Sequence, residues 1–113
     1  MKLITAVFQP STLQEAKDAL TTFGVGGLTV SEVYATTGGD LRVELYRGQR
    51  ITSDLRPCLR VEILATDDDV HELVHIIRQV AGSTTATGHG WLWVTPLDLV
   101  VRVRTGERGA DAV

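Results

Sequence analysis

Two arginines that lie one residue apart, Arg102 and Arg104, follow an apolar run near the end of the sequence. The run predicts a buried strand over residues 97–103, and side chains two positions apart in a strand share a face. Both guanidinium groups would then point the same way from the strand end and could bind phosphate oxygens through paired hydrogen bonds. Two solvated charges are the alternative interpretation. The spacing therefore marks a candidate anion site.

A second pattern, the segment from His71 to His75, reads H-E-x-x-H, as in the zinc-binding helix of metalloproteases. On a helix the two imidazoles lie on the flank away from the apolar stripe, so we expect them to face solvent. A catalytic zinc site needs a third protein ligand, and the remaining histidine, His89, lies in a glycine-rich segment. We expect ordinary surface histidines, with weak metal binding by the pair as the alternative. Cys58 is expected to be a small core residue rather than a nucleophile.

No set of catalytic groups emerges from the sequence, which predicts a protein that is not an enzyme and that needs no cofactor or metal. A chain of 113 residues predicts one domain. Its net charge of −3 and the absence of a dense basic run argue against nucleic acid as a partner. The single cysteine forms no internal disulfide, and no stretch resembles a signal peptide or a membrane span, so we expect a cytoplasmic protein.

The elements that must position the arginines follow the same order in both halves of the chain. Residues 2–8 predict a strand, the S-x-x-Q pattern of Ser11 and Gln14 predicts a capping box that opens a helix, and Gly24 ends that helix. Residues 28–33 predict the second strand.

In the second half, residues 59–64 alternate with a period of two, which predicts a strand with Arg60 and Glu62 on one face. The acids at 67–69 favour the positive end of a helix dipole, and an apolar stripe over residues 70–80 predicts the helix. Two further strands are predicted at residues 91–94 and 97–103.

This order predicts an α+β, ferredoxin-like βαββαβ split sandwich with both helices on one face of the sheet and an extra C-terminal strand. The opposite face of the sheet has no cover within one chain, so we expect a closed homo-oligomer. The polar tail after residue 105 is expected to be partly mobile.

Two loops interrupt this plan. Residues 36–57 show no helical stripe, and such a long loop is either a solvated excursion or an arm that binds a partner. Residues 82–90 are rich in glycine, serine and threonine, and their backbone amides can cradle an anion, although similar loops are common as turns.

With these segments placed, the sequence resembles the PII signal-transduction proteins along essentially its whole length. The resemblance is carried by blocks that recur in order, namely MKLITA at 1–6 with Pro10, GLTVSEV at 27–33, ELYRG at 44–48, Pro57, RVE at 60–62, GHG at 88–90 and VRVRTGE at 101–107. The resemblance implies a ferredoxin-like homotrimer that binds adenine nucleotide in clefts between subunits. It also implies a T-loop at about residues 37–55, a B-loop at about 82–90 and a C-loop at about 102–113.

The resemblance also implies roles for individual residues. Those near the nucleotide would be Thr29, Glu62, Leu64, Gly88, His89, Gly90, Arg102 and Arg104. Those that meet a partner or an effector through the T-loop would be Gly38, Gly39, Arg42, Tyr46, Arg47 and Arg50.

Five positions depart from the family pattern. Gly38 stands where the family has a phosphate-binding arginine, Gly39 stands where it has a glutamine that helps hold magnesium and 2-oxoglutarate, and Trp91 replaces a phosphate-binding lysine. Cys58 stands where a lysine pairs with 2-oxoglutarate, and Ile51 replaces the modified tyrosine. Each lost charge-assisted hydrogen bond to phosphate costs about 1.5–3 kcal/mol. We therefore expect ADP or AMP to be preferred over Mg-ATP, with little response to 2-oxoglutarate.

The resemblance predicts a non-enzymatic regulator that acts on a transporter or metabolic protein through its T-loop and reaches a membrane only through that partner. The weakened phosphate site favours a role in inorganic-carbon metabolism, with bicarbonate as an added ligand. One alternative is a conventional nitrogen-regulatory PII protein that acts on an ammonium channel. Another is a CutA-like structural or metal-binding trimer, for which His71 and His75 are the support.

Overall fold

The computed structural model describes residues 1–36, 42–46, 49–53, 55–84 and 90–113, with backbone alone at 42–46, 49–53 and 83–84. The strands are β1 (Lys2–Phe8), β2 (Thr29–Ala35), β3 (Arg42–Tyr46), β4 (Gln49–Ser53), β5 (Arg56–Ala65) and β6 (Trp91–Pro96). The α-helices are α1 (Leu13–Phe23) and α2 (Val70–Thr84), and the 3-10 turns are η1 (Pro10–Thr12), η2 (Asp67–Asp69) and η3 (Gly109–Ala112).

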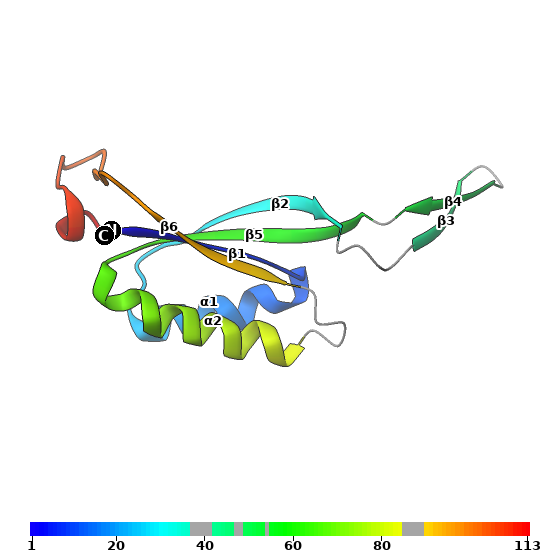
Figure 1. Ribbon diagram of the computed structural model, residues 1–113, viewed down its shortest axis with the longest axis horizontal. Coiled ribbons are helices and arrows are strands. Elements are labelled where there is room, and N and C mark those ends of the chain that lie inside the picture. Colours follow the sequence, from blue (N-terminus) through cyan, green and yellow to red (C-terminus); the bar gives the residue numbers. More distant parts are fainter. Residues whose placement is uncertain (37–41, 47–48, 54, 85–89) are drawn as a thin grey trace.

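Four of the strands form one antiparallel sheet in the order β2-β5-β1-β6, and both α-helices cover the same face of it (Figure 1). This order places the first strand of each half in the centre of the sheet, as expected for two βαβ units that interlock. The predicted ferredoxin-like α+β fold is therefore confirmed.

The core lies between this sheet and the two helices. Alternate residues of β1 (Ile4, Ala6 and Phe8) point toward the helices and are at most 2% exposed. Leu20 of α1 and Leu73 of α2 pack against them in the same buried cluster. The period of two in the strand and the 3.6-residue period in the helices thus meet in one apolar layer.

The first helix begins differently from the prediction. Its N-cap is Thr12, and neither Thr12 nor Gln9, the N-cap of η1, makes a side-chain capping hydrogen bond, so the predicted capping box at Ser11 is wrong. Pro10 instead begins the 3-10 turn η1, in which the Thr12 amide donates to the Gln9 carbonyl at 3.0 Å. The end of the helix is as predicted, because Gly24 adopts a left-handed φ of 118°.

The segment predicted as one long loop contains a β-hairpin. Strands β3 and β4 pair as a separate two-stranded sheet, which extends beyond the end of β2 and the start of β5 (Figure 1). The following strand, β5, begins at Arg56, three residues before the predicted start. Neither α-helix of the described residues is long and apolar enough to cross a membrane.

The C-terminal segment holds the largest departure from the sequence prediction. Residues 97–103 form no strand of the sheet, so the extra C-terminal strand is wrong. After Leu97, the chain bonds to itself: the Arg102 amide donates to the Glu107 carbonyl at 2.9 Å, and the Gly109 amide donates to the Val100 carbonyl at 2.9 Å. Gly106, with a φ of 76°, allows this reversal. The backbone is therefore satisfied locally, without a neighbouring strand.

Candidate functional site

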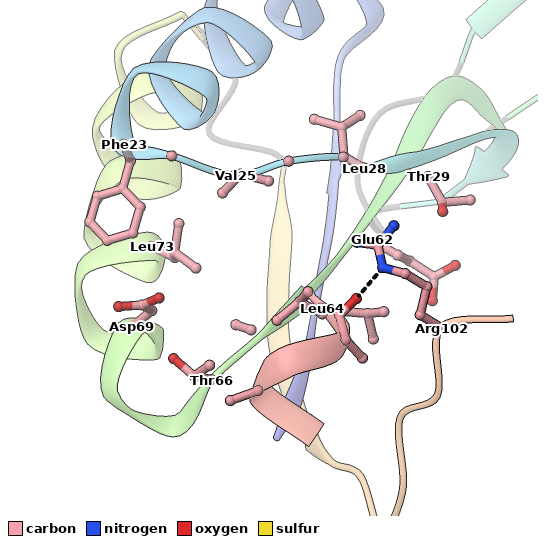
Figure 2. A pocket seen from close by; sticks show the side chains of 17 residues that line it. Phe23, Val25, Leu28, Thr29, Glu62, Leu64, Thr66, Asp69, Leu73 and Arg102 are labelled. Carbon is pink, nitrogen blue, oxygen red and sulfur yellow. Dashed lines mark hydrogen bonds between the residues drawn. The ribbon is translucent and has the colours of Figure 1, made fainter. Parts of the chain in front are cut away.

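A groove of about 670 Å³ opens between the end of α1, the start of α2, strand β5 and the C-terminal segment. Of the residues predicted to bind nucleotide, it collects Thr29, Glu62, Leu64 and Arg102 (Figure 2). Thr29 of β2 and Glu62 of β5 lie directly opposite each other in the sheet register. Glu62 and Leu64 are two residues apart on one strand and so share its face. The fold thus brings together four predicted residues from three separate segments.

The rest of the groove is lined by residues that the sequence prediction missed. The link from α1 to β2 contributes Gly24, Gly26 and Gly27, which leave backbone exposed, together with apolar Val25 and Leu28. This run of glycines is the signal that the sequence offered, because backbone without a Cβ allows a ligand to approach closely.

The remaining walls of the groove come from the entry to α2 and from the C-terminal segment. Thr66 and Asp69 contribute polar groups at the entry to α2, and Ala110 and Ala112 come from the C-terminal segment. Apolar and polar groups alternate around one cavity, as in sites for small amphipathic ligands.

The side chain of Arg102 is held in place. Its Nε donates a hydrogen bond to the backbone carbonyl of Ala112 at 3.0 Å (Figure 2). This bond engages Nε of the guanidinium group. Among the described residues, the terminal amino groups of Arg102 donate no further hydrogen bond. Arg102 is therefore a fixed cation with donors to spare, which suits an oxyanion.

The predicted pairing of Arg102 with Arg104 on one strand face is wrong. Arg104 lies in the turn that reverses the chain, is exposed to solvent and does not line the groove. The reason is the local bonding described above, which replaces the period of two of a strand with a tight turn. Among the side chains that the structure describes, Arg102 is the one that brings a guanidinium to the groove of its own chain.

Gly90, predicted to face phosphate, lies at the far end of the sheet. It precedes Trp91, the first residue of β6, whereas Arg102 follows the other end of that strand (Figure 1). The six residues of β6 span about 20 Å at ~3.3 Å per residue. One chain therefore cannot place Gly90 and Arg102 on the same phosphate. Gly88 and His89 lie outside the described residues.

The T-loop residues are described only in part. Arg42 and Tyr46 begin and end β3, and Arg50 lies in β4, but only their backbone is described. Gly38, Gly39 and Arg47 lie outside the described residues, so their predicted roles stay predictions.

The open face of the sheet, opposite the helices, carries charged and aromatic groups in contact. Nη2 of Arg60 lies 3.7 Å from Oε2 of Glu62, and the guanidinium carbon lies 5.8 Å from the centre of the Trp93 ring. The prediction that Arg60 and Glu62 share one face is confirmed. Trp91 is 65% exposed and Trp93 42% exposed, so this face presents uncovered aromatic surface in a single chain.

The other groups singled out in the sequence form no site among the described residues. His71 and His75 are both exposed on α2, and no cluster of three metal-ligating side chains occurs in the part of the chain that the structure describes. Cys58 is only half-buried, on the open face opposite Val33 of β2, rather than in the core.

Asp67 accepts a hydrogen bond from the α-amino group of Met1 at 3.0 Å. This bond, together with the positive charge of the amine, lowers the pKa of the Asp67 carboxyl below its usual value. The pair ties the start of β1 to the entry of α2, next to the groove residues Thr66 and Asp69.

The sequence matches the family of nitrogen regulatory protein P-II over residues 1–107. The chain belongs to this family. Its similarity to the nitrogen regulatory protein P-II of Azospirillum brasilense is 39% identity over 113 residues, 100% of both chains. The P-II protein of Rhizobium meliloti (strain 1021) is 36% identical, and nitrogen regulatory protein GlnK of Escherichia coli (strain K12) is 35% identical, each over 100% of both chains.

Membership of the P-II family confirms the resemblance seen in the sequence blocks and agrees with the ferredoxin-like fold. The relatives compared above are regulatory proteins of nitrogen metabolism by name. In this P-II protein, Thr29, Glu62, Leu64 and Arg102 line one groove of the described structure.

Proposed function

We propose that this P-II family protein is a non-enzymatic regulator that binds an adenine nucleotide in the groove. The observation that carries the proposal is that Thr29, Glu62, Leu64 and Arg102, from three distant segments, line a single cavity. Leu64 and the apolar link residues offer surface for a flat base, Glu62 offers an acceptor for hydroxyl groups, and Arg102 offers a fixed cation for phosphate.

The nucleotide site is shared between copies of the chain in a homotrimer. Gly90 precedes β6 and Arg102 follows its other end, and the strand between them spans about 20 Å, so we expect a glycine-rich loop to reach the phosphate on Arg102 from a neighbour. The open face of the sheet, with Trp91 and Trp93 exposed, supplies the aromatic surface that such a neighbour covers.

The preference of the site is for ADP or AMP over Mg-ATP. Among the described residues, Arg102 is the arginine whose side chain lines the groove. Trp91 follows Gly90 at the position where a cationic side chain would bind the end of a longer phosphate chain, and tryptophan carries no charge. Loss of one cation lowers affinity by roughly tenfold to a hundredfold.

The regulated process is nitrogen metabolism. The similarity to nitrogen regulatory proteins over the full length of the chain supports this reading above a role with bicarbonate in inorganic-carbon uptake. The hairpin β3–β4 extends beyond the sheet (Figure 1), which suits an arm that docks on a partner such as an ammonium channel. A CutA-like metal-binding trimer is less well supported, because His71 and His75 join no third ligand among the described residues.

Calorimetric titration with AMP, ADP, Mg-ATP, and Mg-ATP plus 2-oxoglutarate tests the proposal. We expect one ADP or AMP per chain, weaker binding of Mg-ATP and no gain from 2-oxoglutarate. Tight binding of Mg-ATP that depends on 2-oxoglutarate would overturn the preference, and no binding of any adenine nucleotide would overturn the function. A parallel titration with guanosine diphosphate controls for binding through phosphate alone.

A further inference from the structure

The C-terminal segment returns to the groove and contacts the cation that we assign to phosphate. After the reversal at Gly106, η3 brings Ala110, Ala112 and Val113 to the groove wall. Ala112 is only 6% exposed, so the tail packs against the rest of the chain at this residue. Figure 2 shows the hydrogen bond from Arg102 to this segment.

The path of this segment is set by a backbone hydrogen bond and a glycine. The Gly109 amide donates to the Val100 carbonyl at 2.9 Å, and Val100 is 8% exposed, so the start of η3 is fixed to a buried point. Gly109 has a φ of 64°, which a residue with a Cβ adopts only with strain. The position of the Ala112 carbonyl therefore follows from the backbone of its own segment.

We propose that residues 109–113, the C-terminal clamp, position Arg102 for phosphate binding. This inference rests on the proposed nucleotide function and names what regulates the affinity of that site. The Ala112 carbonyl accepts from Nε at 3.0 Å, which fixes the plane of the guanidinium group. With Nε engaged, the two terminal amino groups form the edge that remains for a bidentate contact with an oxyanion.

The physical basis of the clamp is the rotamer freedom of arginine. A free arginine side chain loses conformational entropy worth up to roughly 2 kcal/mol when a ligand orders it. The clamp removes part of that loss before the nucleotide arrives, so it increases affinity for phosphate without touching phosphate itself. Ala112 is thus a positioning residue, which acts through its carbonyl on Arg102.

Removal of the acceptor is the direct test. A variant that ends at Gly109 lacks the Ala112 carbonyl, and a Gly109→Val variant keeps the carbonyl but strains the backbone that places it. We expect both variants to bind ADP about 5- to 30-fold more weakly than the unaltered chain. Arg108→Lys is the matched control, because Arg108 precedes η3, is exposed and does not line the groove. The substitution also preserves the positive charge.

Two readouts separate positioning from a general structural effect. Adenosine carries no phosphate, so its affinity should stay within about twofold in Gly109→Val, which keeps every groove residue, provided that the variant remains folded by its thermal transition. In an Arg102→Ala background, Gly109→Val should weaken ADP binding no further, because the side chain that the clamp positions is gone.

The outcomes differ for the clamp and for the proposed function. Unchanged or tighter ADP binding after loss of the Ala112 carbonyl overturns the clamp, since the carbonyl would then be neutral or a competitor of phosphate. In Gly109→Val, equal losses for ADP and adenosine, or a loss that adds to that of Arg102→Ala, overturn it as well. No binding of ADP by the unaltered chain overturns the proposed function, and the clamp with it.

Discussion

Replacement of the two arginines one at a time should give unequal effects on nucleotide binding. Arg102 lines the groove and is held by the Ala112 carbonyl, whereas Arg104 lies exposed in the turn beyond it. The sequence alone treats the two as an equivalent pair, so their separation in the structure is a strict test of the site.

The size of each effect follows from these environments. Both arginines are exposed in the single chain, but Arg102 lines the groove, where a charge-assisted hydrogen bond to phosphate contributes about 1.5–3 kcal/mol. Arg102→Ala should therefore weaken ADP binding by roughly 10- to 150-fold. An exposed charge in water contributes at most about 1 kcal/mol, so Arg104→Ala should weaken it by less than about sixfold. The phosphate-free ligand adenosine should bind both variants about as tightly as it binds the unaltered chain.

Calorimetric titration at two salt concentrations measures these effects. The loss in Arg102→Ala should persist at both concentrations, and the smaller loss in Arg104→Ala should shrink as salt rises, because exposed charges are screened more strongly. Equal large losses in both variants, or a greater loss in Arg104→Ala, would refute the assignment of the phosphate to the Arg102 side of the groove.

The other predictions concern the core, the phosphate preference, pH and the histidines. Leu73 of α2 is 2% exposed and packs in the core. Leu73→Ala should lower the free energy of unfolding by about 2–5 kcal/mol, measured by urea denaturation. Trp91→Lys should raise the affinity for Mg-ATP by about tenfold or more relative to ADP in the same titration, whereas an unchanged ratio would count against the proposed cause of the preference. Because the folded-state pKa of Asp67 is lowered, its contribution to stability is full above the ordinary carboxyl pKa and is lost as pH falls through the lowered value. Thermal transitions at acid pH should therefore show a smaller pH dependence in Asp67→Asn. Joint replacement of His71 and His75 by alanine should leave ADP affinity unchanged, since both are exposed on α2 and neither lines the groove.

The sequence predicts the elements of the main sheet well, because their periodicity is strong. The strand at residues 2–8 has the predicted bounds, and β5 has the predicted shared face for Arg60 and Glu62. The helix stop at Gly24 also follows from a single residue with a clear physical preference. Local pattern is sufficient wherever burial against one core sets the structure.

The C-terminal segment shows where local pattern fails. Its apolar run has the composition of a buried strand, but Leu99 is 59% and Val103 98% exposed, and the backbone bonds to itself across the reversal at Gly106. The contact between Arg102 and Ala112 joins residues ten apart through a backbone carbonyl, which no side-chain pattern encodes. The groove residues from the α1–β2 link likewise become neighbours of Arg102 only through the tertiary fold.

A structure of the protein determined with bound ADP tests the central claim most directly. We expect the base to lie between Thr29 and Leu64, the phosphates to contact Arg102, and Gly90 of a neighbouring copy to face the same phosphates. Binding of ADP elsewhere, or phosphates that contact Gly90 and Arg102 of one and the same chain, would contradict it.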